Sequence, residues 1–262
     1  MKLCIFTLVL DGMPFIPAQF FTLSRLSFNI DWHWYIVHGA AANTGSTNWC
    51  QRQEPRLSKD GTTEFLNALK GHPRITIIES KWFPGGKDEM VNAALEKIKG
   101  PCALVQMDCD EMWETWQIER IHHMFETDPV GDYMLFDCVF YVGLNIVTTM
   151  RGAYGQNWGE WKRAFRFTPG QKMRHEPPML TGESPKGWQN EATLAAGLCF
   201  HHFSYCFEHQ VAYKAAFYNY PSAVEGWKRL QENTVWPVKH LKDFLPWVDE
   251  YAGADLLNKP SV

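Results

Sequence analysis

Three carboxylates leave an apolar segment together in the stretch PCALVQMDCDEMW, residues 101–113. Asp108, Asp110 and Glu111 follow the run CALVQM, which is typical of a buried strand. Carboxylates repel one another, and removing them from water is costly unless something compensates. One explanation is a solvated turn after the strand. The other is a divalent cation held by Asp108 and Asp110, because this spacing lets both point to one side of an extended segment, and hard oxygen ligands suit Mg²⁺ or Mn²⁺.

The elements that position these carboxylates alternate along the first half of the chain. Apolar runs predict strands at residues 2–10, 32–39, 74–80 and 102–107, and amphipathic stretches predict helices at residues 14–28, 61–71 and 87–100. Continuous apolar strands separated by helices indicate a mainly parallel sheet covered on both faces. Ligands of such sheets bind beyond the carboxyl ends of the strands. This placement favours the cation over the turn.

A second acidic pair in the chain provides a comparison. The segment ETD, Glu126 to Asp128, closes a predicted helix instead of leaving a buried strand. We expect it to be solvated and inert, since an acid-x-acid pattern alone is common and the structural context must confirm it.

Composition excludes several classes of protein. The 262 residues carry a net charge of −4 and the pI is about 6.2, so there is no basic footprint for nucleic acid. Seven cysteines without a CxxC pair indicate a reduced, cytoplasmic protein. The N-terminal run MKLCIFTLVLD is short and lacks a small-residue cleavage site, so it predicts a buried strand rather than a signal peptide. No segment is long and apolar enough to predict a transmembrane helix.

An ordered set of motifs resembles a known family. LVQMDCDE, an apolar strand followed by Asp-x-Asp, resembles the signature of nucleotide-sugar glycosyltransferases of the GT-A fold, specifically the family 2-like group. CIFTLVLDGMPFI and YIVHGAAANTGST resemble its first two strands and their loops, although His38 stands where many members carry Asp. WFPGGKDEMVNAAL resembles the stretch before the Asp-x-Asp strand, and WKRAFRFTPG, RHEPP and HHFSYCFEHQVAYKAAFY resemble lipopolysaccharide-core-type members. The resemblance covers residues 2–220.

The resemblance implies a fold and a division of the chain. The expected fold is a GT-A-like three-layer α/β/α architecture with a mainly parallel central sheet. The catalytic domain would occupy residues 1–220, with a nucleotide-binding half at 1–113 and an acceptor half at 114–220. Residues 221–262 match no motif, and their pattern predicts a helical C-terminal extension of two or three helices. Its tryptophans could line an acceptor groove or seal the main domain, and we expect the second: Trp227, Trp236 and Trp247.

The implied function is metal-dependent transfer of a sugar from a nucleoside-diphosphate sugar to a hydroxyl acceptor, such as a glycan, with inversion. Two alternatives remain open: a sugar nucleotidyltransferase and a non-catalytic nucleotide- or sugar-binding module of the same fold. A nucleotidyltransferase normally has a glycine-rich, basic phosphate loop after the first strand. The stretch VLDGMPF has one glycine and no basic residue, which argues against that class.

Candidate nucleotide-binding residues follow the first two strands and open a helix. Thr7, Asp11, His38 and Gly39 would contact base and ribose, and Lys87 would meet a phosphate at a helix N-terminus. The alternatives are that Thr7 and His38 are ordinary strand residues and that Lys87 is solvated.

Candidate metal ligands are Asp108, Asp110 and His202, with Asp108 also supporting the nucleotide. Divalent Mg²⁺ or Mn²⁺ would take its remaining ligands from diphosphate oxygens and water. His202 enters through the resemblance, in which a later histidine approaches the metal or the diphosphate. It could instead be a strand-edge histidine with satisfied hydrogen bonds. Lys214, on the following predicted helix, could meet a phosphate or be solvated.

Direct displacement requires a base to take the proton of the acceptor hydroxyl. Glu176 in RHEPP is the first candidate, because it matches the family's His-Glu segment and two prolines hold the turn. Glu160 in NWGEWKR is the second. The alternative for Glu176 is an ion pair with Arg174 or Arg163.

Overall fold

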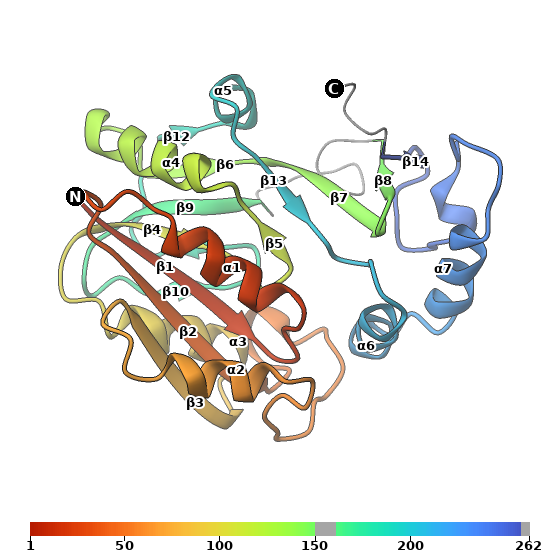
Figure 1. Cartoon of the computed structure of the whole chain (residues 1–262), viewed down its shortest axis with the longest axis horizontal. Helices are drawn as coiled ribbons and strands as arrows, with labels where there is room; N and C mark the ends of the chain where they lie inside the picture. Colours follow the sequence, from red (N-terminus) through yellow and green to blue (C-terminus); the bar gives the residue numbers. More distant parts are fainter. Residues whose placement is uncertain (150–160, 258–262) are drawn as a thin grey trace.

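The structure, a computed structural model, describes residues 1–149 and 161–257. A seven-stranded sheet forms the centre, helices cover both of its faces, and a five-stranded sheet lies beside it (Figure 1). The predicted three-layer α/β/α fold with a mainly parallel central sheet is therefore confirmed. Among the described residues, no helix combines the length and the apolar composition needed to cross a bilayer.

The central sheet has the strand order β12-β6-β9-β4-β1-β2-β3. Neighbouring strands from β4 to β3 pair in parallel, whereas β9 is antiparallel to both β4 and β6. Its strands are β1 Lys2–Val9, β2 Trp32–Ala41, β3 Ile75–Phe83, β4 Cys102–Gln106, β6 Tyr133–Leu135, β9 Lys162–Phe167 and β12 Gly187–Trp188. The four strands predicted from apolar runs are β1 to β4, and they form the parallel part.

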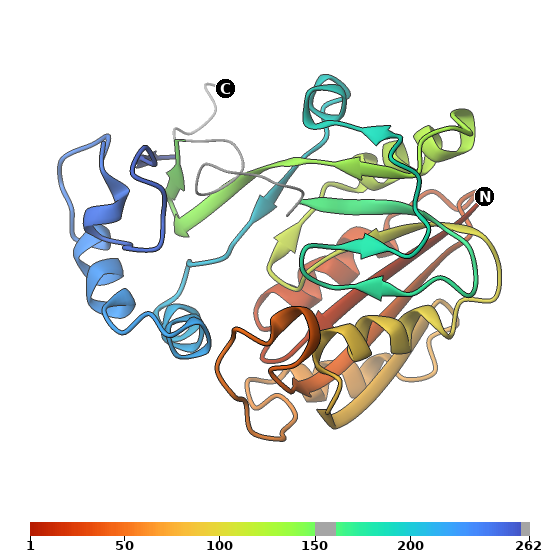
Figure 2. The same ribbon diagram turned by 180° about the vertical axis from the view of Figure 1, so that it is seen from behind.

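Alternation of buried side chains along β1 divides the core between the two faces of the sheet. Leu3 and Ile5 pack on one side with helices α1, α2 and α4, whereas Cys4 and Phe6 pack on the other side with α3. Figure 2 shows α3, coloured yellow, in front of the sheet with the short strands β10 and β11 beside it. These elements are α1 Phe15–Ser24, α2 Thr62–Leu69, α3 Gly86–Leu95, α4 Thr115–Thr127, β10 Met173–Arg174 and β11 Met179–Leu180.

The second sheet has the order β14-β8-β7-β13-β5 and connects the Asp-x-Asp stretch to the last part of the chain. Its strand β5 begins at Glu111, and β13, which ends at His202, pairs with it in antiparallel fashion. Helices α5, α6 and α7 follow β12 and β13. The bounds are β5 Glu111–Met112, β7 Asp137–Gly143, β8 Ile146–Thr148, β13 Cys199–His202, β14 Ala254–Leu256, α5 Asn190–Ala195, α6 Glu208–Tyr218 and α7 Ala223–Gln231.

The C-terminal segment is less helical than its pattern predicts. Within residues 221–257 the structure contains one α-helix, α7, a 3-10 turn at Leu241–Asp243, and strand β14, which pairs with β8. Trp227 lies in the main core and donates its Nε1–H to the Tyr205 carbonyl at 2.7 Å, while Trp236 and Trp247 pack against the same core. The tryptophans therefore seal the domain, as expected.

Candidate functional site

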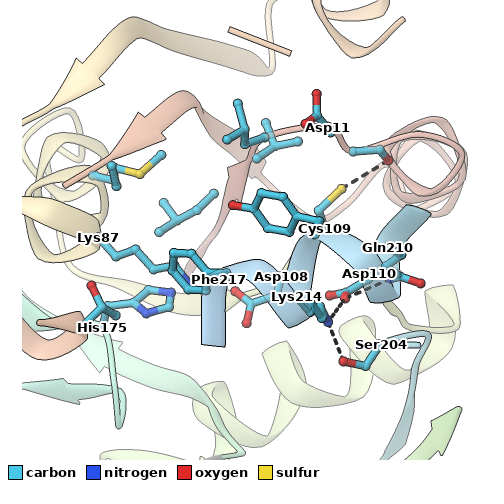
Figure 3. Close-up of a pocket in the computed structure, with 18 of the residues that line it drawn as sticks. Asp11, Lys87, Asp108, Cys109, Asp110, His175, Ser204, Gln210, Lys214 and Phe217 are labelled. Carbon is cyan, nitrogen blue, oxygen red and sulfur yellow. Dashed lines mark hydrogen bonds and ion pairs between the residues drawn. The ribbon is translucent and has the colours of Figure 1, made fainter. Parts of the chain in front are cut away.

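A cavity of about 940 Å³ opens at the carboxyl edge of the parallel strands, where the sequence predicts a ligand site. Its wall is built by the loops after β1, β2 and β4, by the start of α3, by residues 175–178 and by α6. Figure 3 shows side chains from these segments converging on one space. Ionisable side chains that line it include Asp11, Lys87, Asp108, Asp110, Glu176 and Lys214.

Asp108 lies directly after β4 and is held by two donors. Arg163 Nη2 donates to its Oδ2 at 3.2 Å, and Gln106 Nε2 donates to its Oδ1 at 3.1 Å. Burial opposes its ionisation, but the neighbouring positive charges, Arg163 first and Lys87 with it, together outweigh burial and lower the pKa of Asp108. The carboxylate is therefore charged and oriented without any added ion.

Glu111, the third carboxylate of the stretch, does not reach the cavity. It is fully buried and accepts hydrogen bonds from Arg163 Nε at 2.8 and 3.1 Å. Burial opposes the Arg163 charge, but Glu111 and Asp108 outweigh it and raise the pKa of Arg163. Arg163 on β9 thus bridges two acidic residues and is not a partner for Glu176. Arg174 donates to the Pro177 carbonyl instead.

Asp110 is surrounded by donors from the second sheet and α6. Lys214 Nζ lies 2.9 Å from its Oδ2, His202 Nε2 lies 3.4 Å from its Oδ1, and Gln210 Nε2 is 3.4 Å from Oδ2. Burial opposes ionisation, yet Lys214 and His202 lower the pKa of Asp110 far below its ordinary range. Asp110 is the most strongly ionised carboxylate of the stretch.

The three predicted metal ligands do not form one cluster. Across residues 1–149 and 161–257, no group of three or more His, Cys, Asp or Glu side chains is arranged to hold a metal ion. Asp110 and His202 are adjacent, whereas Asp108 faces Arg163. Burial lowers the pKa of His202 and so favours the neutral imidazole that metals bind. Two donors on this side therefore fit an ion that takes its other ligands from a diphosphate and water.

Two predicted nucleotide contacts lie inside the core instead of on the cavity. Thr7 is fully buried, and its hydroxyl accepts a hydrogen bond from Trp34 Nε1 at 2.9 Å. His38 is also fully buried, between Ser58 Oγ at 3.0 Å and Glu79 Oε2 at 3.2 Å. Neither side chain lines the cavity, so their prediction as direct contacts is corrected: both support the strands behind it.

Asp11 and Gly39 do line the cavity. The Asp11 carboxylate accepts a hydrogen bond from the Lys59 backbone at 3.0 Å and pairs with Arg56. Burial opposes its ionisation, but the hydrogen bond from Arg56 helps to lower the pKa of Asp11. Gly39 has φ +141°, and a Cβ there would lie 1.7 Å from the Ser80 carbonyl oxygen. The position therefore admits no side chain.

Lys87 and Glu176 lie at the other end of the cavity. Lys87, in the first turn of α3, has its Nζ 5.4 Å from the centre of the Phe217 ring. Burial opposes its charge, but Glu176 and Asp108 outweigh burial and raise the pKa of Lys87. Its neighbour in Figure 3, His175, stays neutral because burial and the Lys87 charge lower the pKa of His175 to about 3. The Glu176 carboxylate is part of the cavity wall, with a side chain 36% exposed.

Asp88 fixes this end of the site, a role that sequence reasoning missed. Its Oδ1 accepts hydrogen bonds from Ser46 Oγ at 2.6 Å and from the His175 backbone at 2.7 Å, and its Oδ2 accepts one from the Ser46 backbone at 2.8 Å. The Glu176 backbone in turn donates to Ser46 Oγ at 3.2 Å. An acidic residue in the first turn of a helix indicates only a favourable interaction with the helix dipole. The sequence therefore carried no signal for the hydrogen bonds that Asp88 accepts from Ser46 and His175.

Two further candidates have different outcomes. Glu160, the second candidate base, lies outside the described residues. The comparison segment at the end of α4 is peripheral: Glu126 is exposed and accepts a hydrogen bond from the Met1 amino group at 2.6 Å, and Asp128 accepts one from the Val130 backbone at 2.8 Å.

Among known proteins, the chain is similar to solved structures, and these matches are weak. No protein-family model and no curated protein matches the chain. S. aureus TarS 1-349 matches at TM-score 0.46 and 12% identity, over 63% of this chain and 47% of that one. The complex of TarS 1-349 with UDP-GlcNAc matches at TM-score 0.46 and 12% identity, over 63% of this chain and 45% of that one. The mannosyltransferase PcManGT from Pyrobaculum calidifontis, in complex with GDP-Man and Mn2+, matches at TM-score 0.39 and 18% identity, over 54% of this chain and 36% of that one. The chain spans less than half the length of each, and we draw nothing further from matches at these TM-scores.

Proposed function

We propose that the chain transfers a sugar from a nucleoside-diphosphate sugar to a hydroxyl acceptor, such as a glycan, with inversion at the anomeric carbon. The observation that carries this proposal is the position of Asp108 and Asp110 at the carboxyl end of central strand β4, in one cavity with Lys87, Glu176 and His202. The cavity is large enough for a ligand of this kind.

The diphosphate would lie between the Asp-x-Asp stretch and the start of α3. Asp110 and His202 would hold Mg²⁺ or Mn²⁺, which when bound would neutralise charge on the diphosphate leaving group. Asp108, held by Arg163, would support the nucleotide. Lys87 offers a full positive charge at a helix N-terminus, where partial positive charge already favours phosphate.

The base and ribose would occupy the part of the cavity near Asp11 and Gly39. The Asp11 carboxylate is ionised and oriented by Arg56 and the Lys59 backbone. It can therefore accept hydrogen bonds from a ligand without reorganisation. The Gly39 backbone lines the same part of the cavity and approaches the Ser80 backbone too closely for any side chain.

Glu176 is the proposed base that takes the proton of the acceptor hydroxyl as the diphosphate leaves. Its carboxylate is partly exposed to the cavity, and its backbone is fixed through Ser46 to Asp88. A general base requires both access to the acceptor and a fixed position. Glu160 remains the second candidate for this role.

The test is a screen of UDP- and GDP-sugars with Mn²⁺, in which release of nucleoside diphosphate is measured. We expect at least one donor to be hydrolysed slowly without acceptor. Calorimetry with UDP and GDP, with and without Mn²⁺, separates the alternatives. Metal-dependent binding of a nucleoside diphosphate without turnover of any donor would favour the binding module and contradict the transferase.

A further inference from the structure

Lys214 is the closest donor to the Asp110 carboxylate. Its Nζ lies 2.9 Å from Asp110 Oδ2 and also donates to Ser204 Oγ, as the dashed lines in Figure 3 show. The Lys214 side chain is 17% exposed, and the ammonium lies 5.1 Å from the centre of the Tyr205 ring. It is therefore a fixed, partly buried cation and not a loosely solvated one.

The Lys214 ammonium occupies one oxygen of the Asp110 carboxylate, which the proposed Mg²⁺ or Mn²⁺ site requires. Asp110 Oδ1 faces His202, and Oδ2 faces Lys214. A divalent ion that bound Asp110 would meet an ammonium group within a few ångströms, and like charges at such a distance in a partly buried site repel strongly. The lysine and the ion therefore compete for the same carboxylate.

We propose that Lys214 is the resident counter-ion of Asp110, that it holds the divalent-cation affinity of the empty site low, and that a donor diphosphate relieves this competition by accepting the lysine. This inference rests on the proposed function, because it assigns the ion to Asp110 and His202. Metal and nucleotide would then strengthen each other's binding, since thermodynamic coupling between two ligands is reciprocal.

Helix α6 is built for such an exchange. Six of its residues line the cavity, at the three- and four-residue spacings of one helix face: His209, Gln210, Tyr213, Lys214, Phe217 and Tyr218. Lysine has a long flexible stem and a point charge, so Nζ can turn from a carboxylate to a phosphate without movement of the helix. Ser204 and the Tyr205 ring lie beside the ammonium in the position that the structure shows.

The experiment measures Mn²⁺ affinity directly, from the electron paramagnetic resonance signal of free Mn²⁺, without nucleotide. We expect Lys214→Met to bind Mn²⁺ about tenfold more tightly than the unmodified protein. The reason is that removal of one positive charge near the ion removes a repulsion large enough to change the dissociation constant by about tenfold. Lys214→Gln, which can still donate a hydrogen bond to Asp110, should show the same direction. It keeps the test valid if the methionine variant does not fold.

Two further variants separate the possible failures. Lys228→Met removes the same charge from an exposed pair with Glu208 and should leave Mn²⁺ affinity unchanged; Asp110→Asn should abolish binding. If the Lys214 variants bind no more tightly than the unmodified protein, while Asp110→Asn still weakens binding in the presence of UDP or GDP, the lysine proposal is wrong and the metal site stands. If no variant binds Mn²⁺ even with UDP or GDP, both the lysine proposal and the metal-dependent function are wrong.

Discussion

At the residue scale, each carboxylate between Asp108 and Glu111 has a protein cation within reach. Arg163 bridges Asp108 and Glu111, and Lys214 pairs with Asp110. The repulsion that makes this stretch unusual in sequence is thus offset by charges from β9 and α6. The added cation that we propose would bind beside Asp110 and His202, which are adjacent.

The bridge formed by Arg163 predicts a large effect on stability. Arg163→Met leaves Glu111 fully buried without its cation, and breaking a buried pair costs about 3–5 kcal/mol in the free energy of unfolding. Denaturant unfolding measures this loss. Lys172→Met, which removes an exposed pair with Glu96, is the matched control and should change stability by less than about 1 kcal/mol. A similar small effect for both variants would show that Arg163 does not stabilise the buried acid.

Glu176 carries the prediction about chemistry. Glu176→Gln keeps the size of the side chain but cannot accept the acceptor's proton, so kcat should fall roughly a hundredfold or more with little change in donor affinity. Steady-state kinetics with a hydrolysed or transferred donor provide both values. Glu160→Gln is the comparison: if it loses turnover while Glu176→Gln retains it, the base has been assigned to the wrong glutamate. A product with the donor's anomeric configuration would contradict single displacement altogether.

At the scale of elements, the parallel half of the fold was predictable because its signals are local. The strands β1 to β4 are continuous apolar runs, and α1 to α3 are separate amphipathic stretches between them. The start of α2 depends on a contact from outside the helix: Gly61 precedes it at φ +98°, and the Thr62 hydroxyl accepts a hydrogen bond from the Gly12 backbone. The three-dimensional partner of Thr62 is 50 residues away and leaves no trace in the local pattern.

The ion pairs of the site were not predictable for the same reason. Arg163 reaches Glu111 only because β9 pairs antiparallel to β4, and the sequence does not specify that pairing. Lys214 reaches Asp110 because α6 follows β13 back across the cavity. The sequence left open whether His38 contacts a ligand or is an ordinary strand residue, because its partners Ser58 and Glu79 come from other segments.

Strand β2 gives a prediction that separates two costs of glycine replacement. Gly39 and Gly71 both have positive φ, but a Cβ at Gly39 would strike the Ser80 carbonyl, whereas nothing lies within 4 Å at Gly71. Gly71→Ala should cost about 1 kcal/mol, the conformational penalty alone. Gly39→Ala should cost clearly more in urea unfolding, because β2 or β3 must shift. Equal losses would show that the contact between β2 and β3 relaxes without strain.

At the scale of the whole molecule, the cavity is assembled from both halves of the chain. One wall comes from the loops after the parallel strands, while α6 and residues 175–178 close the cavity from segments far along the sequence. The C-terminal segment contributes no lining residue among those described, and packs instead against the core through Trp227. The division into catalytic halves and an extension stays a prediction.

The most direct measurement is Mn²⁺-stimulated release of nucleoside diphosphate from a nucleotide sugar by the unmodified protein and by Asp110→Asn, with circular dichroism to confirm that the variant is folded. The account predicts that stimulation disappears in Asp110→Asn, because the carboxylate beside His202 is lost. Asp128→Asn, at the peripheral acidic segment, should behave like the unmodified protein. Full Mn²⁺ stimulation in Asp110→Asn would contradict the account. It would favour the alternative that the carboxylates after β4 form a charged turn without a catalytic role.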